Sequence, residues 1–76
     1  KMDIYPNPTL DEVNISSDAP ISNVSIFSAL GRQVHSERPN SQESIKLDLS
    51  ELPKGVYHFQ IRLITGELVR RKVVKE

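Results

Sequence analysis

The sequence predicts an all-β domain, an antiparallel β-sandwich of about seven strands. Short runs in which apolar and polar residues alternate recur along the chain, and Gly, Pro, Asn and Ser separate them. No segment shows the 3.6-residue apolar spacing of a helix. Because the chain has 76 residues, we expect one small domain with a modest core.

The alternating runs locate the strands. They occupy residues 11–17, 21–28, 32–38, 45–49, 56–64 and 67–75. The breaks between them lie at residues 18–20, 29–32, 39–44, 50–55 and 65–66. The run at 32–38 holds one apolar side chain, Val34, among charged residues, which is typical of an edge strand. Gly31 and Gly55 lie in turns, where they are free to adopt positive φ.

The inward positions of these runs predict the core of the sandwich, which we expect to span residues 10–76. Side chains in a strand alternate with period two, so every second residue faces the same side of the sheet. The predicted core residues are Val13, Ile15, Val24, Ile26, Val34, Ile45, Leu47, Leu49, Tyr57, Phe59, Ile61, Leu63 and Val73.

Residues 4–9, Ile-Tyr-Pro-Asn-Pro-Thr, predict a different kind of segment. Proline lacks an N–H, so Pro6 and Pro8 cannot donate to a strand ladder. Each also pushes the residue before it, Tyr5 or Asn7, towards extended geometry. We therefore expect this segment to lead into the sheet at an edge.

Composition excludes several kinds of function. Ten basic and ten acidic residues give zero net charge, whereas a nucleic-acid-binding domain needs a basic footprint. The chain has no cysteine, so it forms no disulfide and offers no thiolate ligand. No apolar run reaches the roughly 18 residues of a membrane span, and no signal peptide is visible. Because Lys1 is not an initiator residue, we expect the chain to be a piece of a longer protein.

No catalytic or cofactor-binding constellation emerges from the residues. His35 and His58 fall at outward strand positions without a cluster of further ligands, so we expect surface histidines rather than a metal site. No serine lies in a nucleophile elbow, and no glycine lies in a phosphate-binding pattern. We therefore expect no enzyme activity, no cofactor and no small-molecule substrate.

The last predicted strand is basic. It carries Arg70, Arg71, Lys72 and Lys75. One interpretation is a solvated strand whose positive charges protect a sheet edge. Another is a strand that a partner protein receives by β-augmentation, in which an extended segment adds to the sheet. An exposed edge also allows a strand-exchanged homodimer of the isolated domain.

Four short pieces of the sequence occur in an order that resembles a known family. They are IYPNPT near the start, VSIFSALGRQV in the middle, and LPKGVYHFQI and GELVRRKVVK at the end. From about Ile4 to Lys75 the chain resembles the C-terminal sorting domains of proteins exported by the type IX secretion system, also called the Por secretion system. The resemblance implies an Ig-like β-sandwich.

The resemblance also implies which residues form the motifs of the family. They are Pro6, Asn7 and Pro8 in the first motif, Gly31 in the middle motif, and Gly55, Tyr57, Lys72, Val73, Val74 and Lys75 in the last, with Arg70 and Arg71 of the basic tail beside them. The middle motif departs from the usual pattern, because Ser28 stands where an acidic residue is more common.

By the same resemblance, the expected function is a non-catalytic secretion signal of a Gram-negative bacterium. Cargo enters the periplasm by an ordinary signal peptide. The sorting domain then directs it through an outer-membrane translocon that works with a shuttle protein. A sortase afterwards removes the domain as the cargo is attached to the cell surface. The resemblance thus implies a location in the periplasm during transit and then at the cell surface or outside the cell.

Two other functions stay open at this point. An adhesive or carbohydrate-binding Ig-like module of a secreted enzyme would show an exposed aromatic platform or a metal-lined loop. A passive spacer between an enzyme and its anchor would tolerate free substitution of the basic tail.

Overall fold

The protein folds into six antiparallel β-strands, as seen in a computed structural model that describes residues 1–40 and 42–76. They are β1 (Met2–Tyr5), β2 (Glu12–Ser28), β3 (Gln33–Glu37), β4 (Gln42–Asp48), β5 (Gly55–Leu63) and β6 (Leu68–Lys75). The all-β prediction is confirmed, and the described residues form six strands rather than about seven. Across those same residues, no helix is long and apolar enough to cross a membrane.

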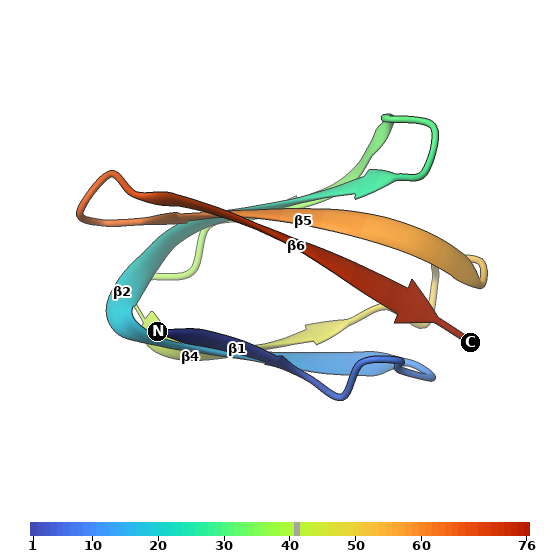
Figure 1. Ribbon diagram of the computed structural model, residues 1–76, viewed down its shortest axis with the longest axis horizontal. Coiled ribbons are helices and arrows are strands. Elements are labelled where there is room, and N and C mark those ends of the chain that lie inside the picture. The colour runs from blue at the N-terminus through green and yellow to red at the C-terminus, as the bar shows by residue number, and fades with distance from the viewer. Residues whose placement is uncertain (41) are drawn as a thin grey trace.

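The sheet is built around β2, which pairs with four other strands. The first half of β2 pairs with β1 and β4, and its second half pairs with β3 and β5. Figure 1 shows β2 passing from the layer that holds β1 and β4 into the layer that holds β5 and β6. The result is a curled half-barrel, and among the described strands its edge strands β1 and β6 do not pair with each other.

The predicted break at residues 18–20 is wrong, because the chain stays in β2 throughout this segment. The pairing register shifts between Ser16 and Ile21 against β4, and again between Ile21 and Asn23 against β5. Pro20 lies in this irregular stretch, where its missing N–H interrupts no regular ladder, and its carbonyl accepts the N–H of Ile64 (3.0 Å). The alternation is lost there because the strand bends and changes partners, not because it ends.

One strand was not predicted, and another begins earlier than predicted. Met2–Tyr5 forms β1, so the sheet begins before the Pro-Asn-Pro turn that we expected to lead into it. β4 begins at Gln42, inside the loop predicted at 39–44, of which Ser41 lies outside the described residues. The first three side chains of β4 are exposed and polar, so only their backbone pairing with β2 marks them as a strand. The expected edge strand is confirmed as β3, which pairs with β2 alone among the described strands.

The core fills the space between the two layers. The buried apolar residues are Met2, Val13, Ile15, Ile21, Val24, Ile26, Ile45, Leu47, Leu49, Tyr57, Phe59, Ile61, Leu63 and Val73. Every predicted core residue is among them except Val34, which packs half-buried against the cluster. Met2 was missed with its strand. Ile21 was missed because the register shift before Asn23 inserts one residue and reverses the alternation, which turns Ile21 to the same face as Val24.

Candidate functional site

The Pro-Asn-Pro turn, residues 6–8, lies against β6 near the C-terminal end of the chain. The Asn7 side chain donates from Nδ2 to the carbonyl of Lys72 (2.9 Å) and accepts at Oδ1 the N–H of Val74 (3.0 Å). A residue of a parallel strand makes the same pattern, because it bonds to two residues that lie two apart on its neighbour. The Asn7 amide therefore substitutes for a strand at this edge. The peptide bonds before Pro6 and Pro8 are both cis.

Thr9 continues the contact through its backbone. Its N–H donates to the carbonyl of Val74 (2.9 Å), and its carbonyl accepts the N–H of Glu76 (2.8 Å). Thr9 is 2% exposed, and its hydroxyl donates to the carbonyl of Glu12. We call the contact of Asn7–Thr9 with Lys72–Glu76 the clasp. It covers the terminal half of the edge of β6.

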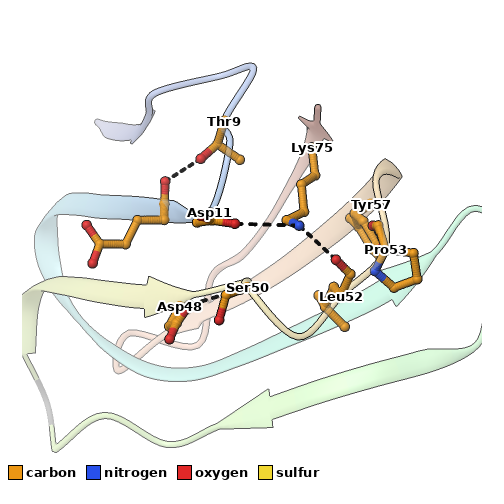
Figure 2. Close-up of polar contacts among 9 residues, drawn as sticks. Thr9, Asp11, Asp48, Ser50, Leu52, Pro53, Tyr57 and Lys75 are labelled. Atoms are coloured by element: carbon orange, nitrogen blue, oxygen red, sulfur yellow. Dashed lines mark hydrogen bonds and ion pairs between the residues drawn. The ribbon is translucent and has the colours of Figure 1, made fainter.

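The buried side chain of Lys75 contacts two other segments at the same end of the fold, as Figure 2 shows. Its side chain is 9% exposed, and its Nζ donates to the carbonyl of Leu52 (2.8 Å) and lies 3.7 Å from Oδ1 of Asp11. Tyr57 donates its hydroxyl to the carbonyl of Pro53 in the same loop. A buried ammonium is costly unless it is hydrogen-bonded and paired, so these contacts explain how a lysine occupies a core position.

The loop after β4 borders the clasp. The N–H of Ser50 donates to Oδ1 of Asp48 (2.9 Å), and this bond, together with a side-chain hydrogen bond from Ser50, holds the pKa of the Asp48 carboxyl below its usual value. The N–H of Leu49 donates to the carbonyl of Asp11 (2.6 Å), which ties the same loop to the segment that follows Thr9.

Most residues singled out by the family resemblance gather at this end. Gly55 and Tyr57 of β5 lie opposite Lys75 and Val73 of β6 in register. The residues in or beside the clasp are Pro6, Asn7, Pro8, Gly55, Tyr57, Lys72, Val73, Val74 and Lys75. Gly31 lies apart from them in the turn after β2, where its φ of 88° suits glycine and its N–H donates to the carbonyl of Ser28 (2.9 Å).

The exposed basic residues of the tail lie at the start of the clasp and just before it. Arg70, Arg71 and Lys72 are exposed, and within the described parts of the chain none of them forms an ion pair. They help to line a shallow hollow of about 350 Å³ on the outer face of the sheet, together with Phe27 and His58. None of the described residues that line this hollow carries a carboxylate, so the surface favours an acidic group over a basic one.

The histidines form no metal site within the described residues. His35 and His58 are both exposed, as predicted, and His35 has its Nε2 3.1 Å from the carboxylate of Glu37. Over residues 1–40 and 42–76, no three His, Cys, Asp or Glu side chains gather closely enough to hold a metal ion.

Residues 3–76 match a family described as the secretion system C-terminal sorting domain, that of the Por system. The chain belongs to this family. It is therefore a sorting-signal domain and not itself a catalytic domain, and it marks a protein that is secreted or exposed at the surface of a Gram-negative bacterium.

The sorting domain is also similar to part of a known enzyme. It is 33% identical over 78 residues to β-agarase D of Zobellia galactanivorans, and the match covers 97% of this chain. The chain spans about 15% of the length of that enzyme. Among solved structures, CopC from Methylosinus trichosporium OB3b matches with a TM-score of 0.53 and 16% identity, over 96% of this chain and 89% of that one. At that identity the likeness shows a shared β fold and nothing more.

Three contacts of the sorting domain were missed by sequence reasoning. Thr9 bonds to β6, Asp11 approaches Lys75, and Leu52 offers its carbonyl to the same lysine. Each contact joins segments that are far apart in the sequence, and no local pattern in the sequence marks any of them.

Proposed function

We propose that this sorting domain is the non-catalytic signal by which a cargo protein joined to it crosses the outer membrane through the type IX translocon. The supporting observation is the family match, which extends over residues 3–76 and so includes both the Pro-Asn-Pro turn and the basic tail. The clasp adds a structural reason for both motifs, because each supplies half of one contact.

The motif residues divide into two groups under this proposal. Arg70, Arg71 and Lys72 are exposed and available to the shuttle protein or the translocon. Val73 and Lys75 are buried, so they act on recognition only by holding the fold. The basic tail is thus a recognition surface at its start and a structural element at its end.

We further propose that a sortase cleaves the chain ahead of the domain and that the cargo is then attached to the cell surface or released. The domain would pass through the periplasm on this route. Similarity to a segment of β-agarase D supports attachment to an enzyme as cargo. The two facing apolar layers support the description of the half-barrel as an Ig-like sandwich.

A secretion assay tests the proposal. Residues 1–76 are fused to the C-terminus of a fluorescent protein that carries an inner-membrane signal peptide. The fusion is expressed in a type IX-competent host and in a translocon-deficient host. Export in the competent host alone is the expected result. Retention in the periplasm of both hosts would show that the chain lacks a sorting role.

The matched variants separate recognition from folding. Deleting residues 70–76 removes buried Val73 and Lys75, so loss of export would not distinguish the two. The combined substitution Arg70→Gln, Arg71→Gln and Lys72→Gln changes only exposed side chains. We expect it to lower export without changing the melting temperature, whereas unchanged export would remove the basic residues from the recognition surface.

A further inference from the structure

The first half of β6 has an open edge. β6 pairs with β5 on one side, and on its other side the clasp reaches only from Lys72 to Glu76. The carbonyl of Lys72 and both backbone groups of Val74 point away from β5, as their bonds to Asn7 and Thr9 show. Backbone groups two residues apart in a strand point the same way, so the N–H and carbonyl of Arg70 also face outward.

The outward backbone groups of Arg70 make few hydrogen bonds within the described chain. Within the described residues the carbonyl of Arg70 accepts only from the guanidinium of Arg71 (3.0 Å), an exposed side chain that can swing aside. No strand of the described sheet lies beside Leu68–Lys72 on this edge. Unpaired strand edges of this kind are templates for an added strand.

The positive charges of β6 indicate which side chains an added strand would carry on its outer face. Arg70 and Lys72 project on the side of the sheet opposite buried Val73, next to Gln60 and His58 in register. An added strand would place every second side chain beside these two cations. Opposite charges on neighbouring strands are favourable and like charges are not, so those side chains should be acidic.

The inner face of the same edge is partly apolar, so it can accept apolar side chains from an added strand. Alternation places Val69 and Arg71 on the inner side, at the open end of the half-barrel. A hollow of about 240 Å³ lies there. Its apolar lining comes from Met2, Ala19, Leu63 and Val69, and its polar and charged lining from Lys1, Ser17, Asp18, Glu67 and Arg71. Inward apolar side chains of an added strand would cover the apolar part of this lining.

We propose that the edge Leu68–Lys72 receives an extended segment of a partner protein in which acidic and apolar residues alternate. The segment adds as a strand, with its acidic side chains towards Arg70 and Lys72 and its apolar side chains over the open end. A second copy of this chain fits less well, because antiparallel pairing of two β6 edges brings the two basic runs together. As a step in export the inference rests on the proposed function, while the binding chemistry does not.

The test uses the whole chain 1–76 and a short acetylated peptide in which glutamate and valine alternate. Amide hydrogen exchange is followed by NMR while the peptide is raised to about 1 mM, where weak strand addition is detectable. We expect the amides of Arg70 and Lys72 to exchange roughly tenfold more slowly with peptide present. A peptide with lysine in place of glutamate should give no protection.

Two changes, one in the protein and one in the peptide, remove the hydrogen bonds along the edge without changing the core. Arg70→Pro deletes a backbone N–H donor that faces away from β5, and we expect the peptide to bind about tenfold more weakly. Arg70→Gln is the control that removes the charge alone. It should weaken peptide binding less and reduce the salt dependence of binding. A glutamate–valine peptide N-methylated on every residue has no N–H on either edge, so it blocks strand addition while the protein stays unchanged. It should not protect the two amides.

Several outcomes would overturn the proposal. They are equal protection by the lysine peptide, full protection by the N-methylated peptide, no response at the highest peptide concentration, and protection that rises with protein concentration alone. The last would assign the edge to a second copy. None of these results bears on export, so a domain that passes the secretion assay and fails this test is a sorting signal recognised by another surface.

Discussion

The two halves of β6 belong to one strand, yet they differ in almost every physical respect. In Val73–Lys75 the inward side chains are buried and the edge is covered by the clasp. In Leu68–Lys72 most side chains are exposed, three successive ones are cationic, and the outer edge has no neighbouring strand among those described. The difference shows that a strand can complete a fold with one half and offer the other half to a partner.

This division has a cause in the sequence. Val73 and Lys75 share a face, and the long apolar stem of the lysine lets it fill a core position while its ammonium reaches the carbonyl of Leu52. Arg71 shares that face too, but it is exposed and borders the hollow between β6 and the opposite layer at the open end. Burial along β6 therefore follows the reach of the opposite layer and not the polarity of the residues.

Lys75→Ala should have the largest effect on the closed half. It removes a hydrogen bond from a charged donor and the packing of the stem, so we expect a loss of about 2–3 kcal/mol in the free energy of unfolding. Urea unfolding measures it. Lys72→Ala is the matched control and should change stability by less than about 0.5 kcal/mol, because its side chain is exposed. Equal losses would abolish the distinction between the halves.

Val73→Ala against Val69→Ala compares the halves with identical chemistry. Val73 is fully buried, so we expect a loss of about 2 kcal/mol from lost burial and the cavity that remains. Val69 is half-buried, so its loss should be about 1 kcal/mol or less. Thermal or urea unfolding of both variants gives the comparison. A larger loss at Val69 would mean that the open end is covered in solution.

Asn7→Ala should open the covered edge at a smaller cost. Two exposed hydrogen bonds are lost and water replaces them, so we expect a loss of about 1 kcal/mol. The sharper measurement is hydrogen exchange of the Val74 amide, which should become faster. Asn7→Asp keeps the acceptor for that N–H but cannot donate to the carbonyl of Lys72. If its Val74 amide exchanges as fast as in the alanine variant, the amide geometry proposed for the clasp is wrong.

The smallest effect concerns pH at the loop that borders the clasp. Hydrogen bonds from Ser50 lower the pKa of Asp48 in the folded state from its ordinary 3.8, so this carboxylate adds stability above that pH. The contribution is lost as the pH falls through the lowered pKa. We expect the stability difference between the natural chain and Asp48→Asn to narrow below pH 3.8 in urea unfolding. A difference independent of pH would contradict this assignment.

Local alternation was enough to predict most of the fold. Strands such as β5, where Tyr57, Phe59 and Ile61 alternate with polar residues, have one face on the core along their whole length. Where this holds, the period-two pattern gives both the strand and its buried side. It failed at residues 18–20, because β2 bends between the layers there and a register shift reverses the face of Ile21.

The candidate site was less accessible to the same reasoning. The resemblance named Asn7 and Val74 as motif residues, but nothing in either motif shows that one bonds to the other across most of the chain. The burial of Lys75 was equally hidden, because its partners are backbone carbonyl and carboxylate groups supplied by other loops. Contacts of this kind depend on the complete topology and have no local signature.

The clasp also sets an order of events. Its side-chain bonds join residues 65 and 67 positions apart, so they cannot form until almost the whole chain is present. When the chain is made or exported N-terminus first, the Pro-Asn-Pro turn appears long before β6 does. The turn therefore stays unpaired until late, because contacts so distant in sequence form after local ones. Closure of the clasp is thus a physical mark of a finished domain, and a chain that stops short of Lys72 cannot make it.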